Sequence, residues 1–341
     1  MNVLSLFDGM SCGQIALTNL GCFPNKYYAS EVDKFAIQQT RHVFPDTIHI
    51  GDVTRVDVSK LDKIDLIIGG SPCQSFSFAG KQAGMATTEN IEVTDLDQYL
   101  DLKIMGFEFT GQSYLFWEYM RILAEVRKYN PDVKFLLENV VMSKKWEAVL
   151  TKAIGVEPVM INSNLLSAQN RKRLYWTNIA EVTQPEDEGV FIRDILEDDV
   201  DEKCYVSDKA RDGMINRAKK GFGGRAVAPN GKANTLCVHH ESLDHNLIVA
   251  SRGRLDADGV TRQHLEPRTD GKSNCLTTVQ KDNLLIENGS TLRRLTPTEC
   301  ARLQTVPSWY EWVVSDTQIY RMCGNGWTVR VIEHILKNLF I

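Results

Sequence analysis

The sequence predicts an α/β fold with a mostly parallel sheet, joined to a smaller β-rich domain. Residues 3–7 form an apolar stretch that leads through a glycine turn into a helical pattern, which is how nucleotide-binding α/β sheets begin. Further short apolar stretches alternate with helical patterns as far as residue 176. From about residue 185, strand signals shorten and Gly, Asn, Asp and Arg become more frequent. We therefore expect an α/β domain in residues 1–184, completed by 318–341, and a second domain in residues 185–317.

The composition is that of a globular protein. Of 341 residues, 43% are hydrophobic and 24% are charged. The first residues carry no basic flank with an apolar core, and no window of about 18 residues is uninterruptedly apolar, so we expect neither a signal peptide nor a membrane span. Eight cysteines without a C-x-x-C pair argue against a zinc site and for reduced thiols in the cytoplasm.

The net charge of −5 is distributed unevenly. Residues 1–202 carry a net charge of −11, residues 203–294 carry +6, and residues 295–341 carry 0. A basic block inside an acidic chain is typical of a surface that binds a polyanion such as a nucleic acid. The alternative is a solvated basic surface without a partner.

Polar side chains follow the first three predicted strands. The turn Asp8-Gly9-Met10-Ser11-Cys12-Gly13 departs from G-x-G-x-x-G, so a dinucleotide pyrophosphate is not specifically indicated. Glu31 follows a strand at 27–30 and suits a ribose diol, because a carboxylate accepts two hydroxyl hydrogen bonds. It could equally cap a helix at 33–42. Asp52 follows a third short strand that ends at residue 50.

A cysteine follows the fourth predicted strand. Asp65-Leu66-Ile67-Ile68 is followed by Gly69-Gly70-Ser71-Pro72-Cys73-Gln74, in which two glycines end the strand and a proline stiffens the turn. A thiol at the carboxyl end of a parallel strand lies where open α/β sheets bind ligands. Cys73 is therefore a candidate nucleophile, with a buried hydrophobic filler as the alternative. Together the four strand ends predict one polar edge of the sheet.

Two later strands add an acid and two arginines. The strand at 133–137 ends in Glu138-Asn139, so Glu138 is expected near the thiol, unless it caps the next helix. Before a further strand, alternation places Arg171, Arg173 and Tyr175 on one face. Two arginines together are costly unless an anion or a carboxylate meets them.

Three other segments stand out. Residues 75–113 form a long connection with an acidic centre, which is typical of a lid, and residues 95–104 could form a short helix within it. Gly-Lys-x-Asn occurs at 231–234 and at 271–274, which suggests paired hairpins carrying one lysine each. Thr296-Pro297-Thr298-Glu299 predicts a capping box at the start of a helix.

Taken in order, these segments resemble the DNA (cytosine-5)-methyltransferase family of bacterial and phage type, over most of the chain. The resemblance is carried by Phe7-Asp8-Gly9, Pro72-Cys73-Gln74, Glu138-Asn139-Val140, Gln169-x-Arg171-x-Arg173, Arg294-Leu295-Thr296 and Gly324-Asn325. Residues 185–290 occupy the place of the family's variable target-recognition domain. Two features depart from the family pattern: an insertion after Lys81, and Gly326-Trp327 in place of a smaller aliphatic pair.

The resemblance implies a Rossmann-like, S-adenosylmethionine-dependent methyltransferase domain and a covalent mechanism. Cytosine C5 is a poor nucleophile, and addition of a thiolate at C6 activates it. Cys73 would be that thiolate, and Glu138 would hold N3. Asn139 would position the Glu138 loop, while Arg171 and Arg173 would bind the cytosine O2 and favour the Cys73 thiolate. No side chain in the sequence is an obvious acceptor of the C5 proton, so water or hydroxide is the expected base.

The resemblance further implies S-adenosyl-L-methionine as the donor and double-stranded DNA as the substrate. The implied cofactor-binding residues are Phe7, Asp8, Gly9, Met10, Ser11, Glu31, Val32, Asp52, Val53, Pro72, Asn325 and Trp327. The expected DNA-binding residues are Gln74, Ser75, Lys81, Lys232 and Lys272. We expect base flipping, a monomer without metal or membrane contact, and a cognate restriction endonuclease on another chain if the protein serves restriction-modification. Cytosine-5 methylation of tRNA and an inactive DNA-binding homologue are the alternatives.

Overall fold

The computed structural model describes residues 1–73, 76, 85–207, 247–255, 261–268, 270–278, 283–287 and 291–340. Four of the residues predicted to bind DNA, namely Gln74, Ser75, Lys81 and Lys232, lie outside these ranges. The first Gly-Lys-x-Asn copy, at 231–234, also lies outside them.

In the described part of the chain, seven strands form one sheet in the order β3-β2-β1-β4-β5-β7-β6. The strands β3, β2, β1, β4 and β5 run parallel, whereas β7 is antiparallel to both of its neighbours. This arrangement confirms the predicted α/β fold with a mostly parallel sheet. The strand bounds are Asn2–Leu6 (β1), Lys26–Ser30 (β2), Ile48–His49 (β3), Leu66–Gly70 (β4), Lys134–Val140 (β5), Val159–Asn162 (β6) and Lys172–Thr177 (β7).

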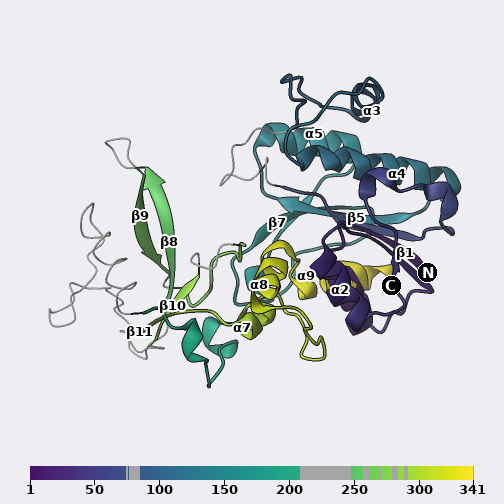
Figure 1. The fold of residues 1–341 in the computed structure, drawn as a ribbon. Coiled ribbons are helices and arrows are strands. Elements are labelled where there is room, and N and C mark those ends of the chain that lie inside the picture. Colours follow the sequence, from purple (N-terminus) through teal and green to yellow (C-terminus); the bar gives the residue numbers. More distant parts are fainter. Residues whose placement is uncertain are drawn as a thin grey trace.

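Helices cover both faces of this sheet (Figure 1). One face packs against α4 (Phe116–Tyr129) and α5 (Lys144–Ile154), and the other packs against α1 (Cys12–Asn19) and α9 (Val329–Leu336). Consecutive residues of β4 alternate between the two cores: Ile67 joins the first and Ile68 the second. Because both faces are buried, the strands read as continuous apolar stretches, which is the pattern that parallel sheets require.

Two other predicted helices are confirmed. Helix α2 (Lys34–Val43) begins after Asp33, whose carboxylate accepts a hydrogen bond from the Phe35 N–H at 2.9 Å. Asp33 rather than Glu31 is therefore the cap, so the capping interpretation of Glu31 is wrong. Helix α3 (Leu96–Ile104) lies within the long connection at 75–113, with Asp95 as its N-cap.

A smaller antiparallel sheet, in the order β11-β10-β8-β9, lies beside the large one (Figure 1). Its strands are β8 (Leu247–Leu255), β9 (Thr261–Pro267), β10 (Leu284–Glu287) and β11 (Thr291–Arg294), all within the predicted second domain. The chain then returns through α7 (Pro297–Leu303) and α8 (Asp316–Asn325). Before α8, the Tyr310 hydroxyl donates to the Met10 carbonyl at 2.8 Å, so this part of the range 185–317 packs on the α/β domain.

The start of α7 is fixed by a buried ion pair. Thr296 and Glu299 form the predicted capping box. Glu299 also meets the Arg293 guanidinium at 2.8 Å through both carboxylate oxygens, and both side chains are fully buried. The two charges compensate each other where water cannot reach, so neither can be removed alone without a large cost.

We expect Glu299→Gln to lower the free energy of unfolding by about 3 kcal/mol, because it leaves the buried Arg293 guanidinium without its carboxylate. Urea unfolding measures this change. The control Glu311→Gln, at a side chain that is 82% exposed, should be nearly neutral. Equal midpoints for the two variants would contradict the assigned role of the pair.

Candidate active site

The loop after β1 adopts unusual backbone geometry. Phe7, Gly9 and Ser11 all have positive φ angles, of 60°, 58° and 64°. Glu31, at the end of the neighbouring β2, accepts a hydrogen bond from the Gly9 N–H at 2.8 Å. Two of these residues are not glycine, so the left-handed conformation is costly and marks a functional turn. The sheet edge therefore brings the predicted cofactor residues of the β1 and β2 ends together.

Asp8 is buried within this loop. Its Oδ1 accepts a hydrogen bond from the Tyr27 hydroxyl at 2.9 Å, while its Oδ2 has no partner among the described residues. Burial raises the pKa of Asp8 to about 6, and the nearby charge of Glu31 acts in the same direction. Asp8 is therefore held where a charged carboxylate is disfavoured.

The other predicted cofactor residues differ in exposure. Asp52 caps a short 3₁₀ helix by accepting from the Thr54 N–H at 2.8 Å, and Val53 is buried behind it. Val32, which follows Glu31, is 71% exposed. Asn325, at the end of α8, is also exposed. Exposed groups at this edge remain accessible to a ligand.

The ends of β4 and β5 place an acid beside the cysteine. These strands pair in parallel, with Gly70 opposite Glu138. Gly70 lies three residues before Cys73 in the sequence. The Glu138 side chain is 10% exposed and both of its oxygens are engaged. Arg173 Nε lies 2.9 Å from Oε1, and the Trp327 indole N–H donates to Oε2 at 3.0 Å. The carboxyl group is thus fixed from two sides.

Cys73 lies in a partly buried loop that Asn139 fixes. The Asn139 side-chain amide donates to the Ser71 carbonyl at 3.2 Å and to the Ser71 hydroxyl at 3.0 Å. Asn139 therefore holds the cysteine loop, and its Oδ1 also accepts a hydrogen bond from the Val140 N–H at 2.8 Å. The expected positioning of the Glu138 loop by Asn139 stays a prediction. Burial raises the pKa of the Cys73 thiol, and the Glu138 charge raises it further, against the opposing effect of Arg173 and Arg171.

The Arg171 guanidinium group donates hydrogen bonds to backbone carbonyls and to a cysteine sulfur. The side chain is 3% exposed and donates to the Gly326 carbonyl at 2.8 Å, the Leu276 carbonyl at 3.1 Å and the Cys275 Sγ at 3.1 Å. These contacts join the loop before α9 to the segment that follows β9. The expected contact of Arg171 with a cytosine O2 stays a prediction, and it would have to be made alongside these bonds.

Sequence reasoning did not identify Cys275 as part of the site. Its Sγ also accepts from Arg173 Nη2 at 3.5 Å, so both arginines meet on one sulfur. Although burial raises the pKa of this thiol, the two guanidinium groups outweigh burial and lower it overall. Cys275 directly follows the second Gly-Lys-x-Asn copy, but no spacing rule connects that segment with Arg171, more than a hundred residues away.

The model of the C-5 cytosine-specific DNA methylase family matches residues 1–101 and 103–340. The chain belongs to this family. The match includes every strand end described above.

Several curated methyltransferases are similar to this methylase along most of its length. The type II methyltransferase M1.ScrFI of Lactococcus lactis subsp. cremoris is 27% identical over 92% of this chain and 71% of its own length. M.HpaII of Haemophilus parainfluenzae is 28% identical over 98% of this chain and 88% of its own length. The orphan methyltransferase M.SPRI of Bacillus phage SPR is 25% identical over 99% of this chain and 97% of its own length.

Solved structures share the fold of this methylase. A DNMT2 mutant of Spodoptera frugiperda superposes with a TM-score of 0.60 at 19% identity, covering 100% of this chain and 99% of that one. A putative DNA modification methyltransferase encoded within a prophage of E. coli gives a TM-score of 0.59 at 21% identity, covering 100% of this chain and 98% of that one.

Lys272, predicted to contact DNA, lies in the interior of the methylase. Its ammonium group donates to the carbonyls of Asn164, Ser167 and Val190, and the side chain is 6% exposed. The adjacent Ser273 pairs with Gln169 in an isolated bridge, so the expected hairpin is not found at this copy. Burial lowers the pKa of the Lys272 ammonium. A phosphate contact would require this group to leave three carbonyl partners, and DNA binding by Lys272 stays a prediction.

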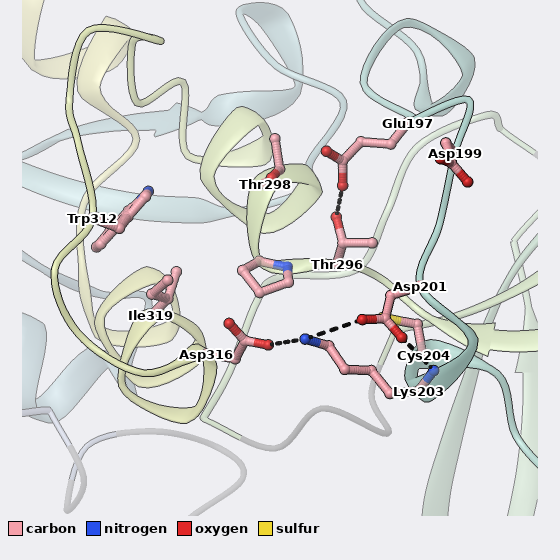
Figure 2. Close-up of a pocket in the computed structure, with 11 residues that line it drawn as sticks. Glu197, Asp199, Asp201, Lys203, Cys204, Thr296, Thr298, Trp312, Asp316 and Ile319 are labelled. Atoms are coloured by element: carbon pink, nitrogen blue, oxygen red, sulfur yellow. Dashed lines mark hydrogen bonds and ion pairs between the residues drawn. The ribbon is translucent and has the colours of Figure 1, made fainter.

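A pocket of about 320 Å³ lies away from these residues, between the segment at 197–204 and the starts of α7 and α8 (Figure 2). Carboxylates dominate its lining, and Lys203 pairs with Asp316 at 2.9 Å within it. None of the predicted catalytic or cofactor residues lines it. Its acidic wall is unsuited to the phosphate backbone of DNA.

The described residues lack two features that would indicate a membrane or a metal. Within those ranges, no helix is long and apolar enough to cross a bilayer. The same ranges contain no cluster of three or more His, Cys, Asp or Glu side chains arranged to hold a metal ion.

The raised pKa of Asp8 predicts a stability effect with a definite sign. Protonation of Asp8 favours the folded state below about pH 4, and this stabilisation is lost as the pH rises through about 6. Asp8→Asn cannot titrate, so its free energy of unfolding relative to wild type should increase by about 2 kcal/mol between pH 4.5 and 7.5. Urea unfolding without methyl donor measures this. The exposed control Asp46→Asn should show no such pH dependence, and the same flat result for Asp8→Asn would contradict the argument.

Proposed function

We propose that this methylase transfers the methyl group of S-adenosyl-L-methionine to carbon 5 of a flipped-out cytosine in a specific double-stranded DNA sequence, through a covalent bond to Cys73. The observation that carries the proposal is the position of Glu138. Its carboxyl group is held by Arg173 and Trp327 at the end of β5, next to the strand that delivers Cys73. An acid and a thiol on neighbouring parallel strands are the two groups that addition to a cytosine ring requires.

The chemistry begins at the Cys73 sulfur. The thiolate bonds to C6 of the cytosine, and the ring electrons move towards C5 and N3. Glu138 supports the negative charge that develops at N3 by hydrogen bonding or proton donation. Carbon 5 then takes the methyl group, loses its proton to solvent, and the carbon–sulfur bond breaks to restore the ring and the thiolate. Asn139 keeps the sulfur in place by holding Ser71.

The edge formed by β1, β2 and β3 fits the methyl donor. Glu31 presents a carboxylate next to the left-handed Gly9 turn, and the space at the Gly9 Cα is open. Carboxylates at strand ends suit ribose hydroxyls, and a neighbouring exposed aliphatic group such as Val32 suits a flat base. When bound, the donor supplies an electrophilic methyl group on a sulfonium. The other residues of the proposed cofactor site are Phe7, Asp8, Met10, Ser11, Asp52, Val53, Pro72, Asn325 and Trp327.

Recognition of DNA falls to the second domain in this proposal. Residues 203–294 carry a net charge of +6, which suits a phosphate backbone. The target base must leave the duplex to reach Cys73, at a cost of a few kcal/mol. We further propose a monomeric cytoplasmic enzyme that protects DNA either beside a restriction endonuclease or as an orphan methyltransferase, since relatives of both kinds are similar to it.

The decisive experiment concerns Cys73. Cys73→Ala should abolish methyl transfer to duplex DNA and retain DNA binding, because the covalent step is lost while the recognition surface is intact. Radiolabelled methyl incorporation measures transfer, with tRNA as the alternative acceptor. The matched control Cys22→Ala removes a partly buried thiol outside the site and should keep full activity.

A second measurement tests the bond itself. Duplex DNA with 5-fluorocytosine in the recognised site should become covalently trapped on the wild-type chain in the presence of the donor. Cys73→Ala should trap nothing. Turnover in Cys73→Ala, or preferential methylation of tRNA, would overturn the proposal.

The raised pKa of Cys73 predicts the pH dependence of the reaction. Since burial and Glu138 disfavour the thiolate, its population at neutral pH is small and rises with pH. The single-turnover rate of the assembled complex should therefore increase by about tenfold per pH unit between roughly pH 6.5 and 8.5. Rapid-quench methylation measures this rate. A plateau starting below pH 7 would show that thiolate formation does not limit the reaction.

A further inference from the structure

The strongest unassigned contact in the site is the one between Trp327 and Glu138. Trp327 belongs to the loop between α8 and α9, far from Glu138 in the sequence, yet its indole N–H donates to Glu138 Oε2 at 3.0 Å. The resemblance to the methyltransferase family assigns this loop to the cofactor. The hydrogen bond instead directs the tryptophan towards the acid that is proposed to hold the cytosine ring.

The backbone of this loop is fixed on both sides of Trp327. The preceding Gly326 carbonyl accepts from Arg171 at 2.8 Å and from the Gln304 amide at 3.3 Å. The following Thr328 hydroxyl donates to Gln304 at 2.9 Å and accepts from Ser163 at 2.9 Å. Because both neighbours of Trp327 are held, Gly326 through its carbonyl and Thr328 through its hydroxyl, the loop presents the indole from a defined position.

The end of β4 leaves room for this hydrogen bond. A Cβ placed on Gly70 would lie 2.8 Å from the Trp327 Nε1 and 3.0 Å from Glu138 Oε2. Any side chain at position 70 would therefore displace the two atoms that form the bond. The hydrogen bond thus depends on three separate segments of the chain. One supplies the Trp327 N–H, one supplies the Glu138 carboxyl group, and Gly70 leaves the space between them.

We propose that Trp327 is a positioning residue for Glu138: its indole N–H fixes the carboxyl group in the orientation that serves cytosine N3. The inference rests on the proposed function and deepens it. A glutamate side chain has several rotatable bonds, and a single contact with Arg173 leaves it free to turn about that contact. A donor on the second oxygen removes this freedom and leaves another lone pair of the carboxyl group for the proton that it would share with cytosine N3.

The arrangement also links Glu138 to the second arginine. Arg173 binds both Glu138 and the Cys275 sulfur, Arg171 binds the same sulfur, and Arg171 returns to the Gly326 carbonyl next to Trp327. Together with the Trp327–Glu138 hydrogen bond, these contacts form a closed ring around the proposed catalytic acid. Trp327 is the member of this ring whose N–H can be removed without removing a charge.

The test separates addition to the ring from methyl transfer. Without donor, addition of Cys73 to C6 lets C5 take a proton from water, and reversal of the addition can release the original C5 hydrogen. Release of tritium from duplex DNA containing [5-³H]cytosine therefore reports the step that Glu138 serves, with no cofactor present. Trp327→Phe keeps an aromatic ring and removes the N–H.

We expect Trp327→Phe to slow tritium release by about tenfold, the effect of losing a hydrogen bond to a charged group. With donor present, kcat should fall by a similar factor while KM for S-adenosyl-L-methionine changes less than about threefold. The control Trp309→Phe removes an indole N–H that donates to Asn19 at the surface, at 3.3 Å, and should match wild type. Gly70→Ala, which displaces the same bond from the β4 side, should reproduce the loss if Trp327→Phe does not fold.

The outcomes are distinguishable. Tritium release by Trp327→Phe at the wild-type rate, with only KM for the donor raised, would show that Trp327 serves the cofactor alone and would overturn the inference. Absence of tritium release from the wild-type protein would instead overturn the proposed covalent function. Slow release by both Trp327→Phe and Gly70→Ala, with an unchanged Trp309→Phe, supports the positioning role.

Discussion

The site depends on the parallel pairing of β4 with β5. That pairing sets Gly70 opposite Glu138, so the chain that leaves β4 towards Cys73 and the last residues of β5 emerge side by side. Asn139 then joins the two segments through Ser71. Backbone hydrogen bonds of a buried sheet cannot slip by one residue without turning every side chain to the other face. The register of β4 and β5 therefore sets where the acid and the segment that leads to the thiol emerge from the sheet.

The antiparallel strand β7 completes the site for a topological reason. Its direction is opposite to that of β5, so its first residues meet the last residues of β5, with Arg173 opposite Val140. A parallel strand would have carried Arg173 to the far end of the sheet. One reversed strand thus delivers the arginine to the same edge as Cys73 and Glu138, where the carboxylate offsets the cost of burying its charge.

Local patterns predicted the parts of the site that local structure determines. The glycine turn, the Gly-Gly-Ser-Pro-Cys segment and the Glu-Asn pair each follow an apolar strand, and the carboxyl ends of parallel strands share one edge. The Thr296 capping box was also readable, because its partners lie within one helical turn. These residues needed only periodicity and the rule that ligands bind at strand ends.

The remaining contacts join segments that no local pattern connects. Trp327 reaches Glu138 across 189 positions of sequence, and Arg171 reaches Cys275 across 104. Lys272 is a residue whose contacts the sequence also did not reveal. Its place in a basic block predicted exposure to solvent and contact with DNA, whereas in the structure its ammonium group donates to backbone carbonyls. The charge of a segment does not say which members of it point inward.

The position of Cys275 and Leu276 has a consequence for protein engineering. Both residues fall inside the variable region by sequence, yet both accept hydrogen bonds from Arg171. The Leu276 N–H also donates to the Gln169 Oε1 at 2.8 Å. A chimera built to read a new DNA sequence would have to import its new segment ahead of residue 270 and retain the host's residues from there onward. A splice made near residue 290 would replace the segment whose Cys275 and Leu276 contact Arg171.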